Sequence, residues 1–162
     1  MFMGNLKSTF LSIVLLNTML FFALIAIHEI SHVFVGYCMG CQIEKAILFD
    51  SSFSGPHTEM LCATNMNELL VYLGGLAITA AFSLSFLFAE SKDRNISFIS
   101  LGISVMLSSM DITMLLGMQS LLYPLLTASL ALITAGEYFM GSYYFKDDVS
   151  FGFLKSAPIL EE

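Results

Sequence analysis

Two histidines and a glutamate within five residues form the part of the chain best suited to chemistry. The segment His28-Glu29-Ile30-Ser31-His32 matches the pattern H-E-x-x-H. Residues four apart lie on one face of an α-helix, so both imidazoles can reach a single metal ion. Glu29 is placed to accept a proton from a water molecule that the metal activates. The pattern therefore predicts two ligands and the general base of a zinc-dependent hydrolase.

These ionisable groups lie in one of the most apolar stretches of the chain. In hydrocarbon, each such group is costly unless it is paired, bound to a metal or facing a water-filled cavity. That cost disfavours a purely structural role for the cluster. The five-residue pattern arises by chance in roughly one chain in a few hundred of this length. The elements around the motif must therefore supply further evidence.

The composition indicates an integral membrane protein. Of the 162 residues, 57% are hydrophobic and 12% are charged, and the mean hydropathy is +0.82; a soluble domain carries about 25% charged residues. A net charge of -7 with six Lys and Arg residues argues against a nucleic-acid partner, because no basic patch could neutralise a run of phosphates. We expect a single membrane domain over residues 1–145 and a short acidic tail over residues 146–162.

Four apolar segments predict four transmembrane helices. Residues 9–27 form an apolar run of about 19 residues, long enough to cross a membrane, and we interpret it as an uncleaved first helix that continues through His32 to Gly36 or Gly40. The sequence therefore predicts an all-α membrane protein with a short β-hairpin-like insertion between the first two helices. The other predicted helices run from Asn65 or Asn67 to Phe88, from Ile96 to Met118, and from Pro124 to Gly141.

The insertion follows from a change in character after the first helix. Residues 42–49 have strand-like content with partial alternation, and residues 50–56 are rich in turn formers. We expect the hairpin to lie at the membrane surface or beside the metal site, since non-helical backbone at membrane depth needs protein or a cavity to satisfy it. One hypothesis is that its edge pairs with an extended substrate.

Three cysteines are too few for a disulfide framework. We interpret Cys38, Cys41 and Cys62 as small apolar side chains. An alternative stays open, in which the C-x-x-C formed by Cys38 and Cys41 combines with His57 and Cys62 in a second zinc site or acts as a redox pair.

Asp111 is the charged residue of the third segment, and a carboxylate in the body of a membrane helix is a functional hypothesis by default. At about 1.5 Å per residue, the two histidines lie ~29 to 35 Å along a helix starting near residue 9, and Asp111 lies ~22 Å along one starting near residue 96. Both helices run in the same direction, so the three groups can occupy a similar level. With a water molecule, His28, His32 and Asp111 would make the open arrangement of a catalytic Zn²⁺, one per chain.

Three further residues each have two interpretations. Glu137, near the end of the fourth segment, is expected to be an interfacial carboxylate, with a role as third metal ligand as the alternative. Gly74 and Gly75, inside the second segment, indicate either ordinary close packing of a neighbouring helix or a direct place at the metal site.

The basic residues predict the orientation in the membrane. With four helices, both termini and the loop at residues 90–95 share one side, and Lys45 lies on the other. The positive-inside rule then places both termini in the cytoplasm. The basic residues on the side of the termini are Lys7, Lys92, Arg94, Lys146 and Lys155.

Over residues 10–120, this arrangement resembles the site-2 protease family of intramembrane zinc metalloproteases. The resemblance consists of the H-E-x-x-H motif on a membrane helix, the strand-like hairpin, the second-helix segment Leu73-Gly74-Gly75-Leu76-Ala77-Ile78-Thr79, and Asp111 on the third helix. It implies a zinc ion held by His28, His32 and Asp111, with Glu29 as the catalytic base. It also implies hydrolysis of a peptide bond in or beside a transmembrane segment of another membrane protein.

The chain departs from that family in two places. Where the family has a Gly-Pro-x-x-Asn-like pattern on the second helix, this chain reads Gly75-Leu76-Ala77-Ile78-Thr79, without the Pro and Asn associated with substrate binding. Where the family has a Leu-Asp-Gly-like context for the third ligand, this chain reads Met110-Asp111-Ile112. There is no inserted PDZ-type domain, so the membrane core or a partner would have to select the substrate.

The predicted function is therefore a zinc-dependent intramembrane endopeptidase acting within the lipid bilayer. One alternative is a membrane metal-binding or transport protein, in which the metal ligands and Glu137 line an ion path. Another is a catalytically silent relative that binds membrane helices. Glu29 separates these hypotheses, because a hydrolase needs its carboxylate for turnover and a transporter does not.

Overall fold

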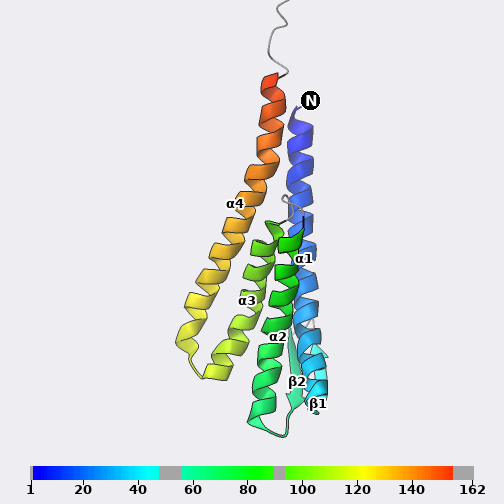
Figure 1. The fold of residues 1–162 in the computed structure, drawn as a ribbon, viewed down its shortest axis with the longest axis vertical. Helices are drawn as coiled ribbons and strands as arrows, with labels where there is room; N and C mark the ends of the chain where they lie inside the picture. The colour runs from blue at the N-terminus through cyan, green and yellow to red at the C-terminus, as the bar shows by residue number, and fades with distance from the viewer. Residues whose placement is uncertain (1, 48–55, 90–93, 155–162) are drawn as a thin grey trace, which may run out of the picture.

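The computed structural model describes the backbone of residues 2–47, 56–89 and 94–154, and the side chains of residues 10–47, 56–89 and 94–143. Four helices of the described chain are long and apolar enough to cross a membrane. The predicted number of helices suited to a membrane is confirmed, and a two-stranded antiparallel sheet lies between the first two helices as expected. The elements in order are α1 (Phe2–Cys38), β1 (Gln42–Ile47), β2 (His57–Leu61), α2 (Asn65–Ser85), η1 (Phe86–Phe88), α3 (Ile96–Leu116), η2 (Gln119–Leu121) and α4 (Leu122–Leu154) (Figure 1).

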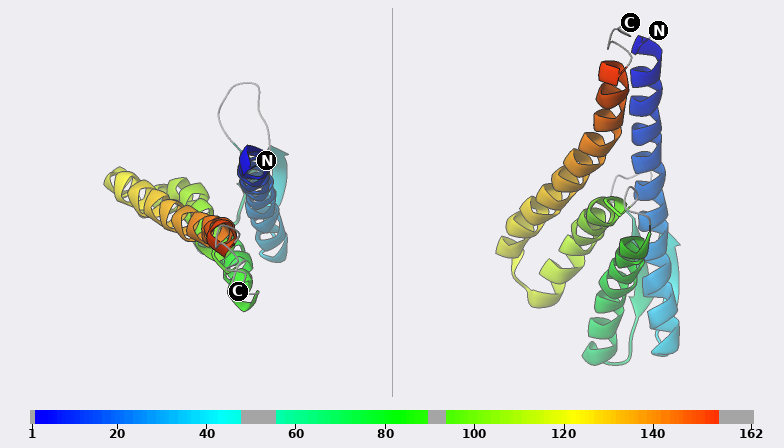
Figure 2. Two further views of the ribbon diagram at one scale, coloured as in Figure 1. Left: turned by 90° about the horizontal axis from the view of Figure 1, so that it is seen from above. Right: turned by 45° about the horizontal axis from the view of Figure 1, so that its top comes forward.

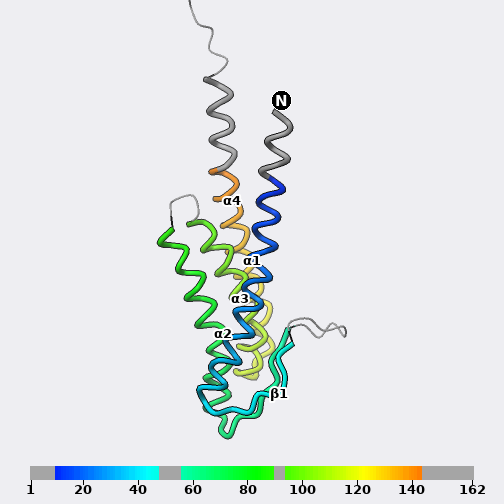
Figure 3. The backbone as a smooth tube through the Cα atoms, turned by 90° about the vertical axis from the view of Figure 1, so that its right-hand side faces the viewer, coloured from blue at the N-terminus to red at the C-terminus, as the bar shows by residue number. Residues whose placement is uncertain are grey.

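Helices that follow one another in the chain also pack side by side. α2 lies against α1 and α3, and α3 also lies against α4 (Figure 2). The start of α1 and the end of α4 extend together at one end of the molecule (Figure 1). The hairpin and the turn between α3 and α4 lie toward the other end (Figures 1 and 3). The apolar core joins α1, α3 and α4 through Leu20, Leu24, Ile99, Ile103 and Met140.

α3 packs on its neighbours largely through small hydroxyl side chains. Ser100, Ser104 and Ser108 are fully buried, and the Ser104 hydroxyl lies 3.0 Å from that of Ser83 on α2. Small residues allow membrane helices to approach closely, and lipid offers these hydroxyls no competing partner. The position of α3 relative to α2 is thus fixed by close contact and hydrogen bonding as well as by apolar burial.

A disulfide between Cys41 and Cys62 joins the two strands of the hairpin at the end away from their connecting loop. Gln42 pairs with Leu61, so the residue before β1 and the residue after β2 are brought together by the antiparallel register. The interpretation of Cys41 and Cys62 as small apolar fillers was therefore wrong. Their sulfurs are also unavailable for a second zinc site or for a redox pair with Cys38, which is a free, exposed cysteine.

Several predicted boundaries need correction. The N-cap of α2 is Thr64, whose hydroxyl accepts a hydrogen bond from the Asn67 amide, and not Asn65 or Asn67. α1 begins at Phe2, seven residues before the apolar run, and α4 continues to Leu154 instead of ending near Gly141. Hydropathy marks the part of a helix suited to lipid, whereas the backbone hydrogen bonds continue beyond it.

α3 ends at Leu116, two residues before the predicted end at Met118. Gly117 ends the helix in the left-handed conformation, at φ 62°. A glycine adopts that conformation without the steric cost of a Cβ atom. The predicted turn at residues 50–56 falls mostly outside the described residues, as do residues 90–93 of the charged loop and residues 155–162 of the predicted tail.

Candidate metal centre

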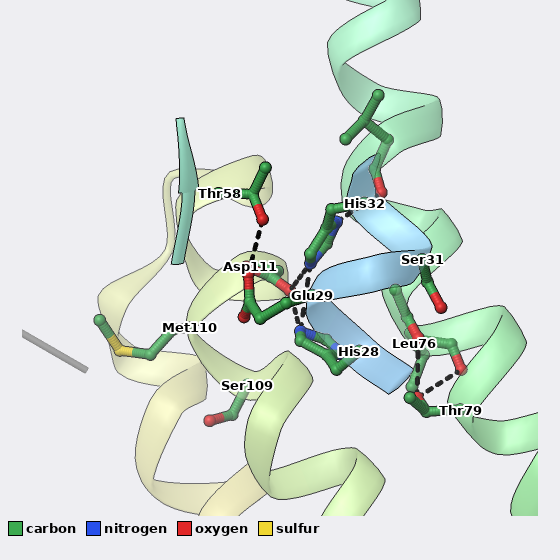
Figure 4. Close-up of polar contacts among 12 residues, drawn as sticks. His28, Glu29, Ser31, His32, Thr58, Leu76, Thr79, Ser109, Met110 and Asp111 are labelled. Carbon is green, nitrogen blue, oxygen red and sulfur yellow. Dashed lines mark hydrogen bonds and ion pairs between the residues drawn. The ribbon is translucent and has the colours of Figure 1, made fainter. Parts of the chain in front are cut away.

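α1 and α3 bring the three predicted metal ligands together. His28 and His32 are one helical turn apart on α1, and Asp111 faces them from α3 (Figure 4). His28 Nε2 and His32 Nε2 lie 3.0 and 3.2 Å from Asp111 Oδ2, and the two nitrogens are 3.1 Å apart. Both imidazoles are buried, and the Asp111 side chain is 18% exposed. Of the described residues, these three form a group that could hold a metal ion.

The hydrogen bonding of His32 determines which of its nitrogens faces this group. His32 Nδ1 lies 2.9 Å from the carbonyl oxygen of Val71 on α2. A carbonyl oxygen only accepts, so Nδ1 carries the hydrogen and the Nε2 of the neutral ring presents a lone pair. That lone pair points at another imidazole nitrogen and at a carboxylate oxygen. Three electron-pair donors meeting at one buried point favour a bound cation between them.

The three donor atoms fit a zinc ion both in their chemical type and in the distances between them. Two imidazole nitrogens and one carboxylate oxygen are the three-ligand combination of many catalytic zinc sites. Around a tetrahedral zinc ion with bonds of ~2.0 to 2.2 Å, neighbouring ligand atoms lie about 3.3 to 3.5 Å apart. The three atoms here form a triangle with sides of 3.0, 3.1 and 3.2 Å. An outward movement of a few tenths of an ångström would seat the ion.

α2 contributes a glycine that lets both imidazoles occupy their positions. A Cβ atom built on Gly75 would lie 2.6 Å from Cε1 and Nε2 of His32 and 2.9 Å from Cε1 of His28. A Cβ atom on the adjacent Gly74 would instead lie 2.6 Å from a methyl group of Val35. Both interpretations left open by the sequence therefore apply, one to each residue: Gly74 serves helix packing, and Gly75 borders the metal centre.

Glu29 lies beside the three candidate ligands and is 4% exposed (Figure 4). Its Oε2 accepts a 2.8 Å hydrogen bond from the hydroxyl of Thr58 on β2. No sequence pattern indicated Thr58, because a threonine in a short strand carries no signal for a contact with a residue on the preceding helix. The hairpin thus lies beside the candidate site and contributes a polar group to it.

A cavity of about 390 Å³ opens over these residues. One part of its wall is polar and includes the candidate ligands, Glu29 and Thr58. Another part is formed by long, flexible apolar side chains. These are Met60 on β2 and Met106, Leu107, Met110 and Met114 on α3. The volume is in the range of ligand-binding pockets.

Two residues considered as metal ligands lie elsewhere. Glu137 on α4 accepts a hydrogen bond from the side-chain amide of Asn17 on α1 and is not part of the candidate metal group. His57 lines the cavity, and its Nε2 lies 3.2 Å from Glu59 Oε1. The structure thus selects Asp111 over Glu137 as the acidic member of the group.

Comparison of the chain with protein-family models, with curated proteins and with solved structures finds no match. The class of protein therefore follows from the elements described above: a protein with four helices suited to a membrane and a buried group able to hold a metal ion.

Proposed function

We propose that this protein is a zinc-dependent intramembrane endopeptidase that hydrolyses a peptide bond in an apolar segment of another membrane protein. The observation that carries the proposal is the meeting of two imidazole nitrogens and a carboxylate oxygen at one buried point, with the Glu29 carboxylate beside them. The H-E-x-x-H motif, the hairpin and Asp111, on which the resemblance to site-2 proteases rests, point to the same reaction. Zinc bound there would supply Lewis acidity to polarise the scissile carbonyl and activate water.

The other roles in the proposed reaction fall to residues of the chain. His28, His32 and Asp111 would hold the ion, and the Val71 carbonyl fixes the ring of His32 in the tautomer that turns the Nε2 lone pair toward it. Glu29 accepts the proton of the attacking water and returns it to the leaving amine. The cavity leaves room for water and for a substrate backbone next to Glu29. A helical substrate must unwind locally, because its carbonyls are otherwise occupied by intrahelical hydrogen bonds.

The apolar wall of the cavity indicates the kind of segment that would bind. Methionine side chains are flexible and adapt to neighbours of different shape. Four of them, with Leu107, would accept a large apolar side chain beside the scissile bond without strict selection. A charged side chain would lose its hydration there without gaining a partner. The expected substrates are therefore apolar membrane segments.

The decisive experiment compares zinc content and peptide hydrolysis for the wild type and Glu29→Gln in liposomes. We expect about one zinc per chain in both proteins, and turnover of an apolar membrane peptide about 10² to 10⁴ times slower in Glu29→Gln. A chelator should abolish wild-type turnover, and added zinc should restore it. Zinc flux across the liposome that is unaffected by Glu29→Gln, without hydrolysis, would instead establish transport. A wild type without bound metal would refute both functions.

The disulfide supports an orientation in which the hairpin faces an oxidising compartment and both termini face the cytoplasm. Disulfides form and persist outside reducing compartments, and Cys41 of the Cys41–Cys62 disulfide follows the C-terminal end of α1, opposite the start of that helix. The distribution of Lys and Arg favours the same orientation.

We expect a membrane-impermeant maleimide to label the exposed Cys38 in intact cells, with Cys38→Ser as the control. Labelling that requires permeabilised cells would reverse the assignment.

A further inference from the structure

We propose that Thr58 is a positioning residue for Glu29, the proposed catalytic base. In this proposal, β2 holds the hydroxyl of Thr58 against the carboxylate of Glu29. This inference rests on the proposed hydrolase function and deepens it. Its central observation is the 2.8 Å hydrogen bond from Thr58 Oγ1 to Glu29 Oε2. Glu29 is 4% exposed and lines the cavity, so its carboxylate can form hydrogen bonds with protein groups and with water in the cavity.

The geometry of the hairpin supports this role. Side chains two residues apart point to the same face of a strand, so Thr58 and Met60 both face α1. Met60 lies against Gly36, where a Cβ atom would be 2.9 Å from its sulfur. Gly36 follows Glu29 by seven residues, which is two helical turns, so both lie on one face of α1. β2 therefore contacts this face of α1 at two successive inward positions.

The disulfide holds β2 in this position. Cys41 is three residues beyond the end of α1, and its bond to Cys62 anchors the residue that follows β2. The strand that carries Thr58 is thus tied covalently to the end of the helix that carries Glu29. Because the bond to Thr58 occupies Oε2, the carboxylate is held in one rotamer with Oε1 available to the attacking water.

The first test needs no activity. Thermal unfolding of the metal-free protein is compared for the wild type, Thr58→Val, Glu29→Ala and the double variant, with Thr134→Val as a matched control for loss of a hydroxyl on α4. We expect Thr58→Val to lower the Tm in the wild-type background and to have a much smaller effect in Glu29→Ala. Additive shifts would overturn the proposal. If Thr58→Val does not fold, Thr58→Ala takes its place in the cycle.

The second test separates positioning from structure in the zinc-loaded protein. We expect Thr58→Val to keep its zinc and its KM while kcat falls about 10- to 100-fold, because a misplaced base is costly. Thr58→Ser should restore most of kcat, since it keeps the donor. A higher KM with unchanged kcat would show instead that Thr58 contacts substrate. If the zinc-loaded wild type hydrolyses no peptide, the proposed function fails, whereas the unfolding cycle still decides whether the Thr58–Glu29 bond exists.

Discussion

Asp111→Asn should weaken zinc binding by more than about 100-fold. Replacing a residue that only hydrogen-bonds to a metal ligand already lowers metal affinity by about 10- to 100-fold, and Asp111 is itself a proposed ligand. The substitution keeps the size of the side chain and removes its negative charge. The two imidazoles would then face a neutral amide, whose oxygen is a poor ligand for zinc. Zinc affinity can be measured by competition with a chromophoric chelator in detergent.

Glu137→Gln is the matched control for this prediction. It also neutralises a carboxylate within a candidate membrane span, but Glu137 contacts Asn17 and lies outside the metal group. We expect this variant to bind zinc like the wild type. Equal zinc affinity in the wild type, Asp111→Asn and Glu137→Gln would show that Asp111 is not a ligand. A loss of zinc affinity confined to Glu137→Gln would show that the third ligand lies on α4.

Gly75→Ala is expected to weaken zinc binding strongly although Gly75 contributes no ligand atom. The added methyl group would lie 2.6 Å from the ring of His32 and 2.9 Å from that of His28, so both imidazoles must move. His28 Nδ1 is buried without a hydrogen-bond partner among the described residues, so no such bond at that atom holds the ring in place. We expect a loss of about 10- to 100-fold in affinity, comparable to loss of a residue that orients a ligand.

The adjacent glycine distinguishes this effect from general destabilisation. Gly74→Ala places a methyl group 2.6 Å from a Val35 methyl, an equally close contact with a residue outside the metal group. Both substitutions should lower the Tm, because overpacking is destabilising. Gly74→Ala should keep its zinc affinity once folded. If the two variants lose zinc equally, the effect reflects the packing of α2 and not the position of the imidazoles.

The membrane helices and the candidate ligands could be predicted because each produces a local pattern. Long apolar runs indicate spans whatever their neighbours are. Histidines four apart share a helical face wherever the helix packs. Asp111 could be added because a charge in an apolar segment is costly without a partner, and helix lengths placed it at the level of the histidines.

The features that were missed depend on packing between elements far apart in the chain. The contact between Thr58 and Glu29 requires the hairpin to fold back on α1, and no spacing rule connects a strand residue with a helix residue 29 positions earlier. The close approach of Gly75 to the imidazoles depends on the rotation of α2 about its own axis. The disulfide depends on strand register, which places Cys41 and Cys62 at adjacent ends of the two strands.

The end of α4 shows a different limit. Beyond Gly141 the sequence becomes a mixture of polar, acidic and aromatic residues, which predicted the end of the fourth membrane helix and the start of a tail. The helix nevertheless continues to Leu154. A glycine within a helix costs only about 1 kcal/mol relative to alanine, and polar residues are compatible with a helix in water. Loss of hydropathy therefore marks the end of the segment suited to lipid and not the end of the helix.

The division of the metal group between α1 and α3 has a consequence for biosynthesis. Asp111 follows His28 by 83 residues, and at ribosomal speeds of about 5–20 residues per second this separation corresponds to roughly 4 to 17 s. During that interval the newly inserted α1 carries both histidines and Glu29 without Asp111. The free-energy cost of these ionisable groups in an apolar environment lasts until α3 has packed beside α1. Loading of the proposed zinc ion would thus belong to a late stage of assembly, after the third helix has entered the bilayer.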